Sequence, residues 1–129
     1  MNVVTDTHPW VWFLTANPRL SAKARAILSD SSNLIIIPLI VMLEIKYLYS
    51  RKRIAVSYQQ ALERVETTEN ILLYPLDISV VANSPPLLNI HDGIIVGTAI
   101  SLSQELNQPV PLVTIDEAIT ASGLVPVLW

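Results

Sequence analysis

Residues 34–50 read LIIIPLIVMLEIKYLYS and hold two elements that decide the fold. The segment Leu34–Ile37 is wholly apolar and rich in β-branched residues, which is typical of a parallel strand buried on both faces. Pro38 ends the strand, and the largely apolar segment Leu39–Tyr49 is long enough to form a buried helix. A strand that leads directly into a helix is the unit from which α/β folds are built.

The same alternation extends to both sides of this segment. Further strands are predicted at Val3–Thr5, Ile71–Tyr74, Leu112–Ile115 and Val125–Leu128. Helices are predicted after Asp6 or Thr7, after Ser21, at Tyr58–Val65 and Ile78–Asn83, from a cap at Asp92 to Leu106, and as a turn at Glu117–Thr120. The sequence therefore predicts an α/β fold with a central parallel sheet flanked by helices. In such sheets the active crevice lies beyond the carboxyl ends of the strands.

Four carboxylates stand in or at the ends of apolar runs: Asp6, Glu44, Asp92 and Asp116. A carboxylate in apolar surroundings is costly unless it is paired, hydrogen-bonded or bound to a metal. Taken singly, Asp6 and Asp92 are explained as helix caps and Asp116 as a turn residue. Glu44 lies inside a helix and caps nothing, although it could face solvent. Together, the four predict one acidic pocket.

Carboxylate oxygens are the ligands that Mg²⁺ and Mn²⁺ prefer, so the pocket predicts a divalent metal site. Two such ions can clamp an in-line displacement at phosphorus, which makes phosphate chemistry the expected activity. Without metal, crowded carboxylates should bind protons more tightly. Nearby hydroxyls are expected to orient the acids: Thr5, Thr7 and Thr114.

Charge and composition limit the other possibilities. All eight Lys and Arg residues lie between Arg19 and Arg64, so a nucleic acid would have to be held by the first half of the chain. The chain has no cysteine, which excludes disulfides and thiolate chemistry. Its longest apolar run has ten residues, where a membrane span needs about 20. We expect one domain over residues 1–129, with no membrane partner, in the cytoplasm.

Several stretches resemble PIN-domain proteins of the VapC toxin type. The opening Val3–Leu14 is similar to the family's apolar strand, Asp-Thr-His and aromatic first helix, and Pro18–Ser21 is similar to its entry into the second helix. Glu44 takes the place of the family's helix-three Glu. The segments His91–Ala99 and Val113–Ile119 resemble the motifs of the third and fourth acids.

The resemblance implies a Rossmann-like PIN domain with the strand order 3-2-1-4-5. It implies a Mg²⁺- or Mn²⁺-dependent ribonuclease, the toxin of a toxin–antitoxin pair, that forms a homodimer and is inhibited by a protein antitoxin. Carried over by position, the catalytic and metal-binding residues are Asp6, Glu44, Asp92 and Asp116.

Two positions depart from the family pattern. Gly93 follows the third acid and Ile115 precedes the fourth, where many relatives have a basic residue. A cation there would anchor an RNA phosphate or compensate the acids. The departures leave open a catalytically weakened PIN domain that acts as a binding or regulatory module. A phosphoacceptor receiver domain is disfavoured because no Lys follows Lys52.

Other side chains have two interpretations each. His8 and His91 could ligate metal or move protons, but are better explained as a first-turn helix residue and a loop residue. The aromatic residues Trp10, Trp12 and Phe13 could stack bases, but core or interface positions are favoured. The cluster Arg51–Arg53 could hold RNA or simply end a helix in solvent, and Asp77 is interpreted as a turn or cap.

Overall fold

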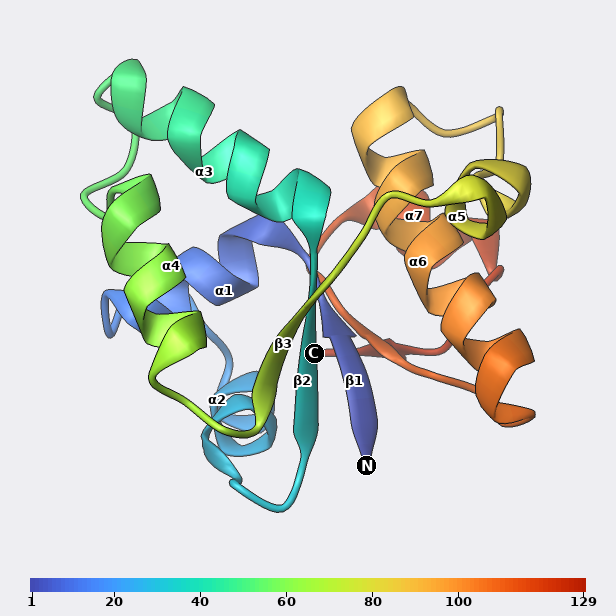
Figure 1. The fold of residues 1–129 in the computed structure, drawn as a ribbon, viewed down its shortest axis with the longest axis horizontal. Helices are drawn as coiled ribbons and strands as arrows, with labels where there is room; N and C mark the ends of the chain where they lie inside the picture. Colours follow the sequence, from blue (N-terminus) through green and yellow to red (C-terminus); the bar gives the residue numbers. More distant parts are fainter.

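Five strands form one parallel sheet in the computed structural model, which describes residues 1–129 (Figure 1). The strands are β1 (Asn2–Thr5), β2 (Leu34–Pro38), β3 (Ile71–Tyr74), β4 (Leu112–Val113) and β5 (Val127–Leu128). Their order in the sheet is β3-β2-β1-β4-β5, and every neighbouring pair is parallel. This confirms the predicted fold class and the strand order that the resemblance implied. With β1 central, the carboxyl ends of β2, β1 and β4 lie side by side.

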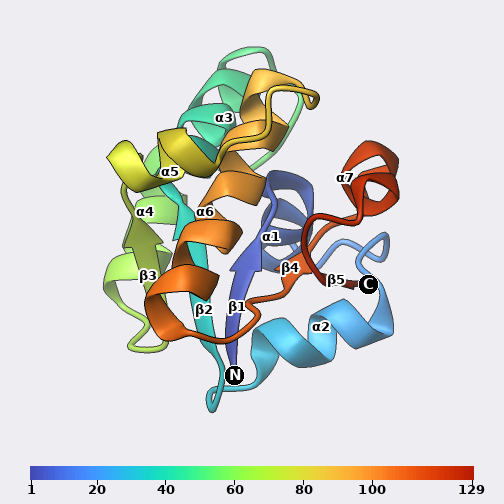
Figure 2. The ribbon, with the colours of Figure 1, turned by 90° about the vertical axis from the view of Figure 1, so that its right-hand side faces the viewer.

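Seven helices cover the sheet, on both of its faces. They are α1 (Thr7–Leu14), α2 (Ala22–Ser29), α3 (Leu39–Ser50), α4 (Tyr58–Glu66), α5 (Ile78–Asn83), α6 (Ile90–Leu106) and α7 (Glu117–Ser122). Helices α1, α2 and α4 lie on one side of the sheet, and α5 and α6 lie on the other (Figures 1 and 2). Helix α3 rises from the carboxyl end of β2. None of the helices is both long and apolar enough to cross a membrane.

The central strands β1, β2 and β4 are largely buried because helices cover both faces of the sheet. Val3, Val4 and Ile35 have no exposed surface, as expected for the apolar runs that predicted central strands. Helices contribute Trp10 from one side and Ile95 from the other, both fully buried. This core holds the carboxyl ends of the strands in fixed positions, and Asp6 and Asp116 follow two of those ends.

Helices α5 and α6 pack closely because Gly97 has no side chain. A Cβ built on Gly97 would lie 2.6 Å from Ser84 Oγ and 2.7 Å from the carbonyl oxygen of Val80. Contacts that short do not occur between real atoms, so any larger residue would push α5 away from α6. Gly97 therefore allows the end of α5 to lie close against the middle of α6.

Several predicted boundaries differ from the structure, and three of them bear on the sheet or the site. Strand β4 ends at Val113 instead of Ile115, because the chain turns there to begin α7. Strand β5 begins at Val127, after Pro126, which has no N–H to donate to the sheet. Helix α6 begins at Ile90, so Asp92 lies inside its first turn and does not cap it.

Candidate functional site

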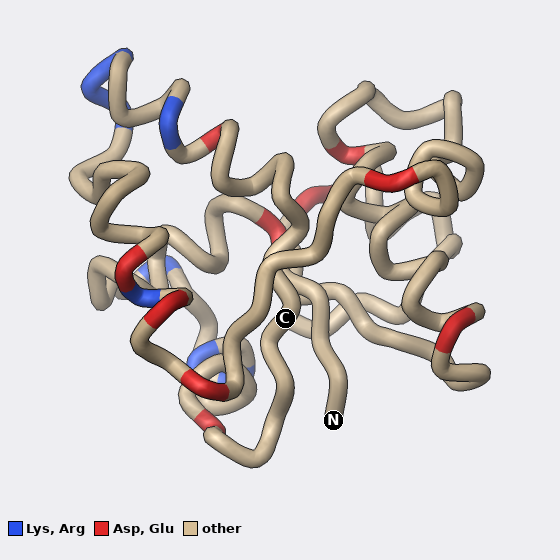
Figure 3. The backbone as a smooth tube through the Cα atoms, viewed as in Figure 1, with Lys and Arg blue, Asp and Glu red and all other residues tan.

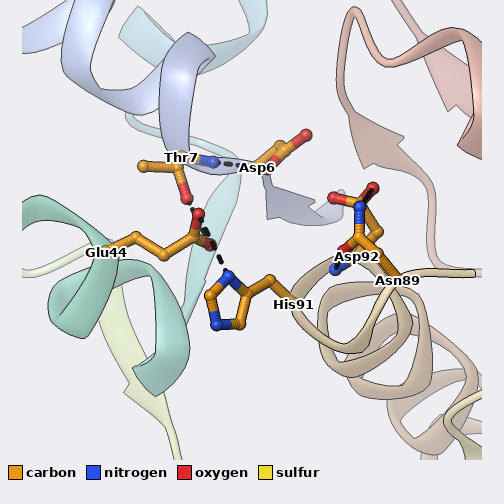
Figure 4. Close-up of polar contacts among 6 residues, drawn as sticks. All are labelled: Asp6, Thr7, Glu44, Asn89, His91 and Asp92. Atoms are coloured by element: carbon orange, nitrogen blue, oxygen red, sulfur yellow. Dashed lines mark hydrogen bonds and ion pairs between the residues drawn. The ribbon is translucent and has the colours of Figure 1, made fainter. Parts of the chain in front are cut away.

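All four predicted acids belong to segments that meet beyond the carboxyl edge of the sheet. Asp6 directly follows β1, Asp116 follows β4, Glu44 lies on α3, and Asp92 lies in the first turn of α6. Figure 4 shows Asp6, Glu44 and Asp92 around one space, each from a different element. The acids are close enough to perturb one another, since neighbouring carboxylates help to raise the pKa values of Asp6, Glu44 and Asp92.

Asp6 is held by two hydrogen bonds. Its Oδ1 accepts from the backbone N–H of Thr7 at 2.7 Å, which caps α1, and its Oδ2 accepts from Thr114 Oγ1 at 2.7 Å. Burial is the main cause that raises the pKa of Asp6, and the negative charge of Asp116 raises it further. The two hydrogen bonds oppose this shift. Asp6 is thus a fixed, half-buried carboxylate that favours either a proton or a cation.

Glu44 reaches the site from the sixth position of α3. Thr7 Oγ1 donates to Glu44 Oε1 at 3.0 Å, and His91 Nδ1 lies 4.0 Å from Glu44 Oε2. Burial raises the pKa of Glu44, with added contributions from Asp6 and Asp92, and the Thr7 bond opposes the rise. The solvent-facing alternative for Glu44 is therefore wrong: its carboxylate turns toward the other acids.

Asp92 is oriented by Asn89, a residue that the sequence interpretation missed. The Asn89 side chain accepts from the Asp92 N–H at 2.9 Å and so caps α6, and its Nδ2 donates to Asp92 Oδ2 at 2.6 Å. Burial raises the pKa of Asp92, as do Asp116 and Asp6. In a capping box, the N-cap residue and the residue three positions later bond to each other. Asn89 and Asp92 have the same spacing.

Asp116 is tied to Asp6 through one threonine. Its Oδ1 accepts from the Ile119 N–H at 2.9 Å and caps α7, while its own N–H donates to Thr114 Oγ1 at 3.0 Å. Thr114 Oγ1 in turn donates to Asp6. The capping interpretation of Asp6 was therefore correct, whereas Asp116, which was interpreted as a turn residue, is the N-cap of α7. Both caps also belong to the acidic group.

Two of the three threonines that were predicted to orient the acids do so. Thr7 and Thr114 are buried and donate to Glu44 and Asp6, as expected for residues that orient acids. Thr5 donates only to the backbone carbonyl of Asp6, so its predicted role toward a carboxylate is not seen. Asp77 is the N-cap of α5, as predicted.

Four other residues of interest lie near the acids: the two histidines, and Gly93 and Ile115, which stand where many relatives have a basic residue. His91 lies in the first turn of α6, not in a loop, and faces Glu44. His8 is exposed on α1, and its charge lowers the pKa of Asp6. A Cβ on Gly93 would lie 3.2 Å from the Pro85 carbonyl, so the loop before α6 leaves little room for a side chain there. Ile115 is half exposed beside Asp116.

The residues match a divalent cation in chemistry, although their side chains are not arranged around one. No group of three or more Asp, Glu, His or Cys side chains is placed to hold a metal ion. The four carboxylates nevertheless offer the oxygen donors that divalent cations prefer, the pKa values of Asp6, Glu44 and Asp92 are raised, and no Lys or Arg lies within 4.0 Å of the four. Ligation would draw these carboxylates together from their present positions.

Known structures share this fold over nearly the whole chain. A structure of VapBC2 from Rickettsia felis bound to a DNA fragment from the promoter has 15% identity and a TM-score of 0.68, covering 99% of this chain and 98% of its own. A structure of VapBC-5 from Mycobacterium tuberculosis, a VapBC toxin–antitoxin family member, has 17% identity and a TM-score of 0.58, covering 98% and 95%.

Comparison of sequences gives the family. Among curated proteins no sequence matches this chain. The family model of the PIN domain matches residues 3–121, from the first core strand through α7, and so includes all four acids. By this match, the chain belongs to the PIN domain family.

Proposed function

We propose that this protein is a Mg²⁺- or Mn²⁺-dependent endoribonuclease, and that Asp6, Glu44, Asp92 and Asp116 hold the metal. The observation that carries the proposal is that four acids from separate parts of the chain lie close enough to influence one another's ionisation. Three of them have raised pKa values, which burial and their neighbours cause. A fold that only needed capping residues would not place Glu44 among them, since Glu44 caps nothing.

The chain's residues prepare this site for a cation. Thr114, Thr7 and Asn89 fix Asp6, Glu44 and Asp92 by hydrogen bonds of 2.7, 3.0 and 2.6 Å. A bound divalent ion supplies a Lewis acid that activates water and stabilises charge on the leaving oxygen of a phosphodiester. These neutral donors limit the orientations of each carboxylate, so fewer orientations would be lost when the acids move together around an ion.

We further propose that the protein is the toxin of a toxin–antitoxin pair, acts in the cytoplasm, and forms a homodimer. The two similar structures are VapBC proteins, which supports an antitoxin partner. Support for a protein interface comes from apolar side chains that remain exposed on α5, on α6 and in the loop between them, at Ile78, Leu87 and Ile90.

Cleavage of labelled single-stranded RNA tests the enzymatic proposal. We expect cleavage with Mg²⁺ or Mn²⁺, no cleavage in EDTA, and recovery when the metal is restored. The Asp6→Asn variant should be inactive, whereas Asp77→Asn, which changes a capping carboxylate outside the acidic group, should retain activity. Cleavage that persists both in EDTA and in Asp6→Asn would exclude this mechanism.

A second candidate is a PIN domain that binds without cleaving. It is favoured by Gly93 and Ile115, which leave the acidic group without a neighbouring Lys or Arg, and by side chains that are not drawn around an ion. This candidate predicts that purified protein binds RNA or a protein partner, while divalent ions change neither binding nor thermal stability. Metal-dependent turnover would rule it out.

A further inference from the structure

A groove beside the acidic group gathers cations and an aromatic side chain. It has a volume of about 520 Å³ and is lined by α1, the loop after α1, the end of α3 and the segment before α4. The polar and aromatic side chains along it include His8, Trp12, Arg19 and Arg53, and no acidic residue lines it. The chain has a net charge of −3, but this groove has two arginines and no carboxylate, so it is locally positive.

The cations of this groove have no acidic partner. No Lys or Arg in the structure lies within 4.0 Å of a carboxylate; the one close pair is His91 with Glu44. The Arg19 guanidinium instead lies 6.0 Å from the centre of the Trp12 ring. A guanidinium over an aromatic ring keeps its N–H edges free, and those edges match the oxygens of a phosphate. Both Arg19 and Arg53 are exposed.

The groove begins at the acidic group. His8, at one end of the groove, lies in the first turn of α1, and Asp6 is the N-cap of that helix. From His8 the groove follows α1 to Thr15, about 10 Å along the helix axis. On the opposite side of the acids, α5, α6 and α7 carry no Lys or Arg, as Figure 3 shows. A polyanion that places one phosphate at the acids can therefore be held only from the α1 and α3 side.

We infer that this groove binds single-stranded RNA next to the cleaved bond, with Arg19 and Arg53 on backbone phosphates and Trp12 against a base. The inference rests on the proposed ribonuclease function and deepens it. Many relatives have basic residues at the positions of Gly93 and Ile115. In this chain Arg19 and Arg53 would attract the phosphates instead, from the α1 and α3 side of the acidic group. Trp12 is half-buried, and its ring centre lies 5.8 Å from that of His8 and 6.0 Å from that of Trp129, contacts that restrict its movement.

The salt dependence of RNA binding tests this assignment. Fluorescence anisotropy with a labelled single-stranded RNA would be measured in the Asp6→Asn background, from about 50 to 200 mM salt. Each phosphate contact on a single strand contributes about 0.7 to the slope of log Kd against log salt. Arg19→Gln with Arg53→Gln should lower that slope by about 1.4, and Trp12→Leu should weaken binding about tenfold with the slope unchanged.

A charge-matched control separates the groove from general attraction. Lys23 and Lys46 are exposed and line no part of the groove, so Lys23→Gln with Lys46→Gln removes the same charge elsewhere. This control should keep most of the slope. Thermal unfolding of each variant would show that all remain folded.

The outcomes distinguish the inference from the function on which it rests. Suppose that the wild-type protein cleaves RNA but that the arginine double variant and the lysine double variant lower the slope equally. The groove assignment would then be wrong, while the ribonuclease proposal would stand. If the protein neither cleaves nor binds RNA, the ribonuclease proposal fails and takes the assignment with it. Tighter binding of a labelled hexaglutamate peptide than of RNA, lost in the Arg19 and Arg53 variant, would instead make the groove a site for an acidic protein segment.

Discussion

Replacing Asp6 by Asn should stabilise the metal-free protein while it abolishes activity. Asp6 is half-buried, and its charge is close to those of Glu44, Asp92 and Asp116. Asn is nearly the same size and can still accept from the Thr7 N–H, as a capping residue must. The substitution therefore removes a poorly solvated negative charge and leaves the backbone arrangement in place.

The sign of the pH dependence follows from the raised pKa of Asp6. Because burial raises this pKa above the unfolded value of about 3.9, protonated Asp6 stabilises the folded state fully below that value. The contribution is lost as pH rises through the folded-state pKa. The advantage of Asp6→Asn should therefore be largest near neutral pH and should shrink toward pH 4.

The expected change in the free energy of unfolding for Asp6→Asn is the difference between a gain and a loss. Relief of partial burial and of repulsion by neighbouring acids should contribute about 2–3 kcal/mol, since burying an ion costs several kcal/mol even after relaxation. Asn has a single acceptor oxygen, so it can keep the Thr7 bond only by turning its Nδ2 toward Thr114 Oγ1, and the loss of the charged acceptor should cost about 1 kcal/mol. The net gain of about 1–2 kcal/mol corresponds to a Tm rise of about 3–8 °C for a domain of this size.

Thermal unfolding in EDTA at pH 7 and pH 4 measures this directly, with Asp77→Asn as the control. Asp77 caps α5 by a similar hydrogen bond but has no part in the acidic group, so its variant should stay within a few tenths of a kcal/mol of wild type. Added Mg²⁺ should raise the Tm of the wild type and not that of Asp6→Asn. A variant less stable than wild type at pH 7 without metal would refute the claim that Asp6 carries an uncompensated charge.

Three further substitutions test other parts of the structure. Thr7→Val removes the donor to Glu44 and should lower kcat/KM about 10- to 100-fold with the fold retained; unchanged kinetics would show that Glu44 needs no orientation. Gly97→Ala places a Cβ 2.6 Å from Ser84 Oγ and should cost about 1–3 kcal/mol in urea denaturation, whereas an unchanged midpoint would contradict the close packing of α5 on α6. Ile115→Arg puts a cation on a half-exposed position beside the acids and should tighten RNA binding several-fold by anisotropy; weaker binding would count against phosphate recognition there.

The sequence predicted the elements well because most have strong local signals. The segment Ile71–Tyr74 and the segment Ile78–Asn83 match β3 and α5 residue for residue. Ser57 and Gln60 form a capping box at the start of α4, which was predicted to begin there. The strand order came from the family resemblance, since the apolar patterns alone do not say which strands are neighbours.

The site was predictable in its acids and not in the groups that orient them. Strand ends and apolar surroundings pointed to Asp6, Glu44, Asp92 and Asp116, but a hydrogen bond such as that between Thr114 and Asp6 joins residues 108 positions apart. No local pattern encodes such a contact, because it depends on β1 and β4 being neighbours. The Asn89 cap was different: its spacing to Asp92 was local and could have been found.

The groove also depends on tertiary structure. Trp12 and the basic cluster that contains Arg53 were interpreted separately from the sequence, and each had two open interpretations. The fold brings the end of α3 beside α1, so that these residues line one groove with His8 and Arg19. Basic residues confined to 19–64 had already indicated which half of the chain would hold a nucleic acid.

Titration of Mn²⁺ into the protein by isothermal calorimetry tests the central claim most directly, because it asks whether the four acids together hold a divalent ion. Wild type and Asp77→Asn should bind alike. Asp6→Asn, Glu44→Gln, Asp92→Asn and Asp116→Asn should each weaken binding at least about tenfold. Wild-type affinity in all four variants would contradict the account, since the acids would then share an electrostatic environment without sharing a metal.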